Sequence, residues 1–105
     1  MEKTSYVISI IFNGCLFTEL IIGQDYKTKH PEMSDELILK LILKLNNLVI
    51  QPADIKEDYL YFMEEPIFLE NKPYRLILVI EKNQKYLGVI NAFRIQEKKY
   101  GISIR

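Results

Sequence analysis

Short apolar runs separated by polar breaks cover most of the chain, and this pattern predicts a protein made largely of β-strands. Residues 6–12 are β-branched and aromatic, as strand residues usually are, and Asn13-Gly14 follows them directly. Asn-Gly is a strong hairpin signal, because a two-residue type I′ turn needs positive φ at both of its positions. We therefore expect a hairpin whose second strand covers residues 16–22 and ends at Gly23.

One segment near the middle of the chain has the spacing of a helix. Ser34 is a suitable N-cap, and two carboxylates follow it where they favour the helix dipole. The helix expected over residues 37–45 is apolar around most of its circumference, with Lys40 and Lys44 on a narrow polar edge. Such a helix has to be covered, by a sheet or by a partner. The apolar positions that repeat at helical spacing are Ile38, Leu41, Ile42 and Leu45.

The rest of the chain has only strand signals. Apolar runs cover residues 58–63, 67–69, 74–81 and 86–95, and a further short strand over 100–104 is left open. Pro66 separates the first two runs, which predicts a break or a bulge in a strand at the edge of a sheet. The run 74–81 is continuously apolar, and this favours a central strand.

These elements predict a single α+β domain that occupies residues 1–105, a usual domain size. The expected order is β-β-α-β-β-β, with a single antiparallel sheet packed on one main helix. This arrangement is the economical way to bury an apolar helix. The other face of the sheet would be more open, so a ligand could sit there.

Charge is unevenly distributed along the chain, although the formal net charge is zero. Residues 1–70 contain 6 Lys/Arg and 12 Asp/Glu, whereas residues 71–105 contain 8 Lys/Arg and 2 Asp/Glu. A basic last third could face an anionic ligand such as RNA. The commoner arrangement is that the two parts neutralise each other across the fold, since runs of charge are usually solvated faces.

Cysteine usage and the N-terminal pattern predict a cytoplasmic protein. Cys15 is the only cysteine, so neither an internal disulfide nor a cysteine-based zinc site can form. We interpret Cys15 as a small packed or turn-flanking residue. The apolar run at 6–12 is too short for a signal peptide or a membrane span. No metal or cofactor is expected, because the sequence has no metal-ligand cluster and no Gly-rich phosphate loop.

His30 is the sharpest candidate for chemistry. It is the only histidine, and an imidazole can give or take a proton near pH 7. Lys27 and Lys29 lie beside it, and Pro31 favours extended backbone at His30, just before the predicted helix. A phosphate at this point would meet helix N–H groups and lysine charge. The plainer interpretation is a solvated or capping histidine at a strand-to-helix junction.

Other candidates lie in and around the two long strands predicted at 74–81 and 86–95. Arg75 and Arg94 suit phosphate, because a guanidinium can bind it through two parallel hydrogen bonds. Asn91 is polar within an apolar strand, so it either binds a substrate or is satisfied by a hydrogen bond within the sheet or at its rim. Three tyrosines could stack on bases, although such residues more often pack at a sheet edge; they are Tyr74, Tyr86 and Tyr100.

A short hairpin and then four short motifs follow one another and together span most of residues 6–95. The motifs are Tyr26-x-x-Lys29-His30-Pro31-Glu32, Pro52-Ala53-Asp54-Ile55, Tyr74-Arg75-Leu76-Ile77-Leu78-Val79 and Val89-Ile90-Asn91-Ala92-Phe93-Arg94. Their order and spacing resemble small toxin-like and phage-associated domains of the barnase, EndoU, colicin and RelE-like ribonuclease superfamily, which includes members of unknown function. The resemblance implies metal-independent cleavage of RNA, in which a 2′-hydroxyl attacks the adjacent phosphate.

The resemblance also implies a role for individual residues. His30 would be the general acid or base, Lys29 would neutralise phosphate, and Arg75 and Arg94 would steady the transition state. RNA and a cognate antitoxin or inhibitor protein would be the partners. The residues expected to contact the substrate are Lys27, Tyr74, Tyr86 and Asn91.

A second hypothesis is a non-catalytic protein-binding or dimerising module of the same fold. Three observations motivate it: the wide apolar helix at 37–45, the neutral net charge, and Asn91, which stands where members of the superfamily often have Thr. No association with a membrane is expected under either hypothesis.

Overall fold

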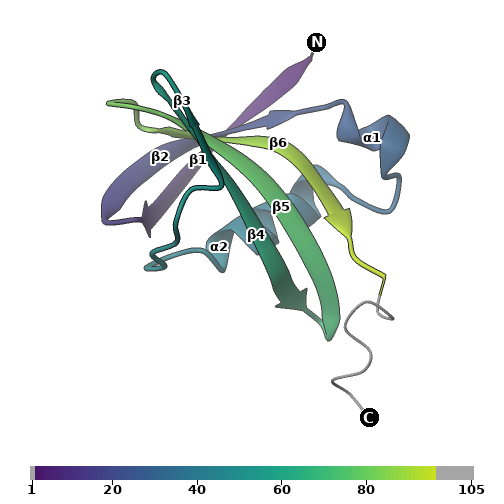
Figure 1. Cartoon of the computed structure of the whole chain (residues 1–105). Helices are drawn as coiled ribbons and strands as arrows, with labels where there is room; N and C mark the ends of the chain where they lie inside the picture. The colour runs from purple at the N-terminus through teal and green to yellow at the C-terminus, as the bar shows by residue number, and fades with distance from the viewer. Residues whose placement is uncertain (1, 97–105) are drawn as a thin grey trace.

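The computed structural model describes residues 2–96. Six strands and two short helices are the regular elements of this region (Figure 1). The strands are β1 (Lys3–Phe12), β2 (Cys15–Gly23), β3 (Asp54–Lys56), β4 (Tyr59–Leu69), β5 (Lys72–Glu81) and β6 (Tyr86–Arg94). The helices are α1 (Tyr26–Lys29) and α2 (Asp35–Leu43). The further strand considered at 100–104 lies outside the described residues.

The strands form a mixed sheet, so the expected single antiparallel sheet packed on one main helix is wrong. The strand order is β1-β2-β6-β5-β4-β3, and every neighbouring pair is antiparallel except β2 and β6. These two run parallel, from the pair Glu19–Tyr86 to the pair Ile22–Val89. Side chains alternate in the same way in both kinds of sheet, so the apolar pattern of these strands carried no information about their direction.

Two elements were also missing from the expected order. The first is α1, where only Tyr26 of four residues is buried, so no apolar repeat marks the helix. The second is β3, which pairs with the start of β4 and is exposed along its whole length. Glu57 in the turn between them has a φ of 53°, and it carries none of the usual Gly or Asn signals for that conformation. Both elements are too short and too polar for a periodic pattern.

Local predictions that rest on turn and cap chemistry are confirmed. Asn13 and Gly14 have φ angles of 53° and 77°, which fits the expected two-residue hairpin between β1 and β2. Ser34 caps α2, because its Oγ accepts a hydrogen bond from the Leu37 N–H at 3.1 Å. The expected interruption around Pro66 is a register shift within β4, where the strand has no outer neighbour.

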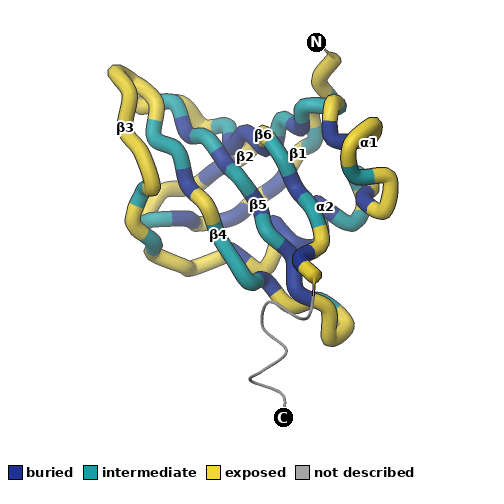
Figure 2. Tube along the Cα trace, turned by 45° about the vertical axis from the view of Figure 1, so that its right-hand side comes forward, coloured by how far each residue is buried: buried dark blue, intermediate teal, exposed yellow. Residues whose placement is uncertain are grey.

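The core lies between α2 and one face of the sheet, which we call the inner face (Figures 1 and 2). The Phe12 ring on β1 meets the Phe62 ring on β4 edge to face, with 5.3 Å between centroids. Three strands separate β1 from β4 in the sheet, so this contact requires a strongly curled sheet. The fully buried side chains of the core include Ile10, Leu20, Ile22, Ile38, Leu41, Ile42, Leu45, Leu76, Leu78 and Leu87.

Asp35 ties three elements together at the start of α2. Its carboxylate accepts hydrogen bonds from the Tyr6 hydroxyl of β1 at 2.6 Å and from the Tyr26 hydroxyl of α1 at 2.5 Å. The Gln24 amide donates to it at 3.2 Å. Burial works to raise the pKa of Asp35, but these hydrogen bonds and the charge of Lys27 outweigh burial and leave that pKa below its usual value.

We predict that Asp35→Asn lowers the free energy of unfolding by about 1–3 kcal/mol at pH 7. The amide can no longer accept both tyrosine hydroxyls, which leaves one partly buried donor without its acceptor. Urea denaturation followed by circular dichroism measures the loss. Glu36→Gln is the matched control, because it removes the same charge from an exposed position in the same helical turn.

The loss in free energy of unfolding caused by Asp35→Asn should depend on pH, and the same pair of variants tests this. The pKa of Asp35 is lower in the folded protein than its ordinary 3.8, so the wild-type advantage is complete above that value. The advantage disappears as the pH falls through the lower folded-state pKa. A wild-type advantage over Asp35→Asn that stayed constant down to pH 2 would contradict this assignment.

Candidate functional site

His30 lies directly after α1, and both its backbone N–H and its backbone carbonyl form hydrogen bonds. Its N–H donates to the Tyr26 carbonyl at 2.6 Å, and its carbonyl accepts from the Met33 N–H at 2.9 Å. The imidazole stacks on the Phe93 ring with 4.8 Å between centroids and 27° between planes. The His30 side chain is 26% exposed, so the ring is oriented by the protein and still reaches solvent.

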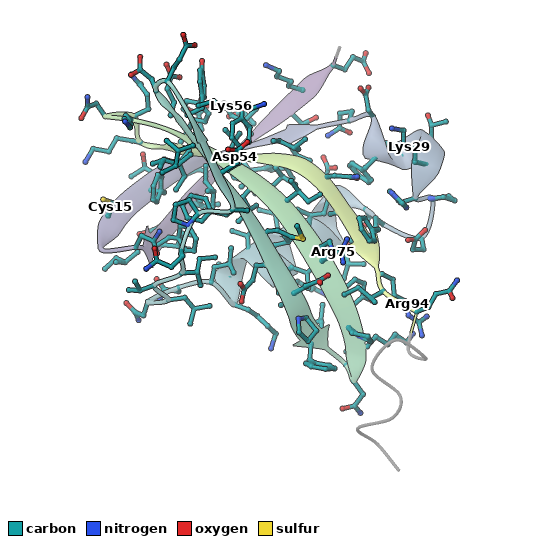
Figure 3. All side chains as sticks on the ribbon, in the orientation of Figure 1. Cys15, Lys29, Asp54, Lys56, Arg75 and Arg94 are labelled. Atoms are coloured by element: carbon teal, nitrogen blue, oxygen red, sulfur yellow. The ribbon has the colours of Figure 1, made fainter. Side chains whose placement is uncertain are left out.

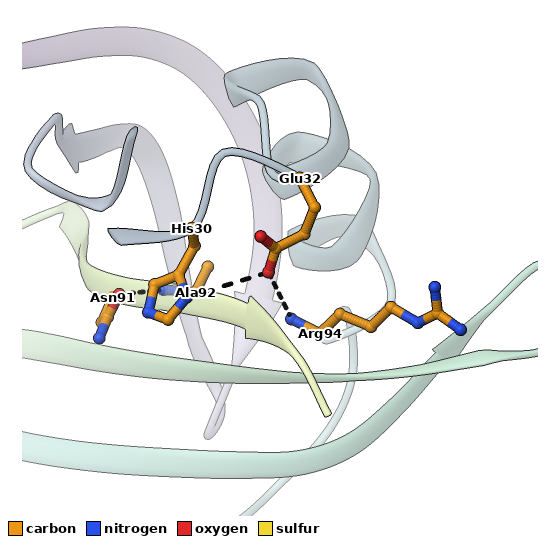
Figure 4. A network of polar contacts seen from close by, with 5 residues as sticks. All are labelled: His30, Glu32, Asn91, Ala92 and Arg94. Carbon is orange, nitrogen blue, oxygen red and sulfur yellow. Dashed lines mark hydrogen bonds and ion pairs between the residues drawn. The ribbon is translucent and has the colours of Figure 1, made fainter. Parts of the chain in front are cut away.

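The position of His30 follows from where β2 ends. Pairing of β2 with β6 stops at Val89, so the rest of β6 has no strand on that side. The segment containing α1 and His30 lies there instead, as Figure 4 shows. Glu32 in this segment accepts a hydrogen bond from the Arg94 N–H at 3.4 Å, and the same carboxylate oxygen lies 3.9 Å from His30 Nδ1. The loop therefore replaces a strand at this edge.

A bulge in β6 places two more side chains near His30. Ile77 pairs with Asn91 and Leu78 pairs with Val89, so Ile90 is an extra residue with no partner on β5. Before the bulge Val89 faces the core, and after it Ala92 does. The extra residue therefore turns Asn91 and Phe93 to the face opposite α2, which we call the outer face.

Asn91 is satisfied within its own strand, because its Oδ1 accepts a hydrogen bond from the Ala92 N–H at 2.9 Å. Its side chain also lines a pocket, described below. The two interpretations left open by the sequence, a hydrogen-bonded sheet residue and a ligand contact, are therefore compatible.

The two candidate arginines lie differently with respect to His30. Arg75 on β5 is the cross-strand partner of Phe93, and its guanidinium carbon lies 5.2 Å from the centre of the Phe93 ring. Arg75 also forms an ion pair with Glu65 through its Nε. Arg94 lies at the end of β6 (Figure 3), and its side chain runs away from His30 (Figure 4). The structure thus joins Arg75, but not Arg94, to the histidine through one aromatic ring.

A pocket of about 510 Å³ lies on the outer face, beside the cluster formed by His30, Phe93 and Arg75. Tyrosines from β4 and β6 line its walls, Gly88 contributes backbone, and two lysines come from β1 and α1. Its volume falls within the range of roughly 300–1,000 Å³ that is typical of small-molecule sites. The lining residues that bear on function are Lys3, Lys29, Tyr59, Tyr61, Tyr86, Gly88 and Asn91, together with Asp25.

Tyr86 is held firmly in the pocket wall. Its hydroxyl donates a hydrogen bond to Glu81 Oε1 at 2.9 Å. Burial and this carboxylate together raise the pKa of Tyr86 to about 12, so the phenol stays neutral at physiological pH. A fixed, neutral ring is a suitable surface for a planar ligand.

Three of the residues predicted from the sequence line the pocket, and these are Lys29, Tyr86 and Asn91. Tyr74 was expected to stack on a base, but it is 7% exposed and belongs to the core. Its position on β5 alternates with that of Arg75, so it lies on the inner face, away from the tyrosines of the pocket. Lys27 is exposed on α1 and does not line the pocket, and Tyr100 lies outside the described residues.

Several residues of the site were not predicted. Tyr59 and Tyr61 alternate with Leu60 and Phe62 along β4, so the period of two could have placed them together on the outer face. Phe93 could not be found in this way, because its direction depends on the bulge at Ile90. Nothing in the sequence connects Lys3 with the pocket.

Comparison of the chain with models of known protein families, with curated proteins and with solved structures finds no match. Within residues 2–96, no three His, Cys, Asp or Glu side chains are grouped as a metal ion would require. Neither helix of this region has the length and apolar content needed to cross a membrane. The function therefore has to be argued from the site.

The stacking of His30 on Phe93 makes a prediction that proton NMR can test directly, because the chain has one histidine. The carbon-bound imidazole protons lie over an aromatic ring, so they should resonate upfield of those of a free histidine. Phe93→Leu should remove the displacement. Phe68→Leu, at a half-exposed position on β4, should leave it unchanged. Identical imidazole shifts in wild type and Phe93→Leu would rule out the stacked arrangement.

Proposed function

We propose that this protein is a toxin-like, cytoplasmic, metal-independent endoribonuclease whose substrate lies on the outer face of the sheet. One observation carries the proposal. The only histidine is held by Phe93 beside an arginine that contacts the same ring, next to a pocket lined by lysines and tyrosines. An imidazole for proton transfer, cations for phosphate and aromatic rings for bases are the groups that this reaction needs.

The proposed reaction uses the 2′-hydroxyl of RNA as its nucleophile. A bond forms between the 2′-oxygen and phosphorus, the bond from phosphorus to the 5′-oxygen breaks, and a 2′,3′-cyclic phosphate and a 5′-hydroxyl result. His30 takes the proton from the 2′-hydroxyl or returns one to the leaving 5′-oxygen, and water serves the other oxygen. The Phe93 stack and the bonded backbone of His30 support this role because they hold the imidazole in one orientation.

Positive charge for the phosphate comes from Lys29 and Arg75 in this proposal. Lys29 is the chain neighbour of His30 and lines the pocket, and Arg75 contacts the ring on which His30 stacks. Glu65 binds Arg75 through Nε and so orients the guanidinium. Arg94 has no part in the proposed chemistry, because its side chain is directed away from His30.

A cognate inhibitor protein fits the same proposal. A toxin-like nuclease needs to be silenced in the cell that makes it, and the open outer face offers the site to cover. Such a partner would present carboxylates to Lys3, Lys29 and Arg75, since these residues provide the positive charge at the site.

We predict that the purified protein cleaves single-stranded RNA in the presence of EDTA and that His30→Ala lowers the rate by about 10²–10⁴-fold. Loss of the only proton-transferring imidazole is the reason. Cleavage is measured on an end-labelled oligonucleotide, and a single 2′-deoxy substitution at the cleaved position should block the cut.

Lys44→Gln is the control. Lys44 is exposed at the far end of α2, so this substitution removes a charge without changing a residue of the site. It should cleave at the wild-type rate. The proposal fails if wild type and His30→Ala are equally inert on free and on ribosome-bound RNA, or if both cleave equally fast.

The alternative function is a non-catalytic dimerising or partner-binding module. One observation that motivated it no longer supports it, and another observation now does. The apolar face of α2 is buried against the protein's own sheet, so it presents no uncovered stripe. Exposed apolar side chains occur at the tip of the first hairpin and beside it instead. Ile11 and Leu16 are cross-strand partners, 44% and 45% exposed, and Val49 is 76% exposed.

If this hairpin surface drives self-association, the double variant Ile11→Thr/Leu16→Thr should be a monomer at concentrations where the wild type is a dimer. Threonine keeps the β-propensity and removes apolar surface. Light scattering after size exclusion measures the mass. Val7→Thr, on the same strand at a 94% exposed position, is the control. A wild type that is monomeric at every concentration would exclude the dimer.

A further inference from the structure

We propose that the outer-face pocket holds one nucleotide of the RNA strand, with its base among Tyr59, Tyr61 and Tyr86 and its 3′-phosphate near Lys29. The inference rests on the proposed function in taking RNA as the polymer. It goes further by assigning a base-binding subsite to residues that lie apart from His30, and its test does not need catalysis.

The walls of the pocket are suited to a planar ring. Tyr59 and Tyr61 project from alternate positions of β4. Tyr61 is paired with Val79 of β5, whose partner on β6 is Gly88, and Tyr86 lies two residues before Gly88 on the same face of β6. The hydrogen bond from the Tyr86 hydroxyl to Glu81 fixes one of the three rings. Aromatic side chains on an open sheet face are a recurrent platform for single-stranded bases, because every base has a face that can stack.

Because Gly88 has no side chain, space is left for the ring of the base at the bottom of the pocket. A Cβ at this position would lie 2.8 Å from Val79 Cγ1 and 3.8 Å from the Tyr86 ring carbon Cε1. Both of these atoms belong to residues that line the pocket. Any side chain at position 88 would therefore push Val79 aside and fill space between the tyrosines. The glycine is explained by close packing at the site, since its φ is not in the left-handed region.

The charges at the rim identify the ligand as an anion with a polar edge. Lys3 from β1 and Lys29 from α1 are exposed residues of the pocket lining, and Asp25 is the one carboxylate among the described lining residues. Asn91 adds an amide at the end of the pocket closer to Phe93 along β6. A base, a sugar and one phosphate match this combination of aromatic walls, an amide and two ammonium groups.

The path along β6 gives the nucleotide its direction. The outer face of this strand presents Gly88, then Asn91 and then Phe93. The His30 imidazole stacks on the Phe93 ring. Lys29 lines the pocket and directly precedes His30 in the chain. A nucleotide whose base lies over Gly88 would thus place a phosphate near Lys29 and the imidazole. We assign it as the 3′-phosphate because the proposed reaction joins that phosphate to the 2′-oxygen.

The test is a titration of the His30→Ala variant of the 105-residue chain with the four ribonucleoside 3′-monophosphates, followed by ¹H–¹⁵N NMR. We expect saturable shifts of the Gly88 backbone amide and the Asn91 side-chain amide. Ribose 5-phosphate, which has a phosphate but no base, should bind about tenfold more weakly. Replacing Lys3 and Lys29 by Gln should weaken binding and reduce its dependence on salt.

Two variants test the base subsite itself. Gly88→Ala should weaken nucleotide binding by about tenfold, because Val79 is displaced into the pocket. Tyr59→Leu at the 37% exposed rim should have a similar effect and does not depend on tolerance at position 88. Phe68→Leu removes a ring from the same strand outside the pocket and should bind like the parent protein.

Absence of saturable shifts, equal binding of ribose 5-phosphate, or unchanged affinity in both Gly88→Ala and Tyr59→Leu would each overturn the inference. The outcome is separable from that of the proposed function. Binding without RNA cleavage by wild type would refute the ribonuclease and keep the subsite. Cleavage without perturbation of Gly88 and Asn91 would refute the subsite and keep the ribonuclease.

Discussion

The pairing of β2 with β6 is the interaction on which the arrangement of this protein depends. Among the strands of residues 2–96 it is the one parallel pairing, and it attaches the hairpin of β1 and β2 to the four-stranded unit formed by β3, β4, β5 and β6. It ends at Val89, part of the way along β6, and the edge beyond is covered by the segment that carries His30. A longer β2 would have paired with the rest of β6 and left no place for the histidine. The short parallel ladder therefore creates the site.

The second determinant is the single extra residue in β6. Ile90 shifts the alternation of the strand, so that Ala92 instead of Asn91 faces α2. A small apolar residue then fills the core position, and the amide reaches the pocket. The same shift turns Phe93 outward, where it meets both His30 and Arg75. One bulge thus protects the core from a polar group and assembles the outer-face cluster, as bulges near functional sites often do.

The outer face contains two neighbouring parts with different chemistry. The pocket offers rings, an amide and lysine charge, which suit recognition of a ligand. The cluster around Phe93 offers an oriented imidazole and a guanidinium, which suit proton transfer and charge stabilisation. Asp35 contributes at a distance, because its bonds to Tyr6 and Tyr26 fix the start of α2 and the helix that precedes His30.

The sequence by itself determined the features that depend on neighbouring residues. Asn13-Gly14 set the first hairpin, Ser34 set the start of α2, and the apolar alternation located the long strands. It also drew attention to His30, Lys29, Tyr86 and Asn91. These features follow from φ preferences, capping and side-chain period, which act over a few residues.

Only the tertiary structure decided which strand lies beside which, and in what direction. The parallel partner of β2 lies far along the chain, and the bulge at Ile90 appears only when β6 is laid against β5. For this reason the sequence missed Phe93 and grouped Arg94 with Arg75. A strand alternates identically whatever its neighbour, so the face on which a residue finally lies depends on long-range pairing that no local pattern records.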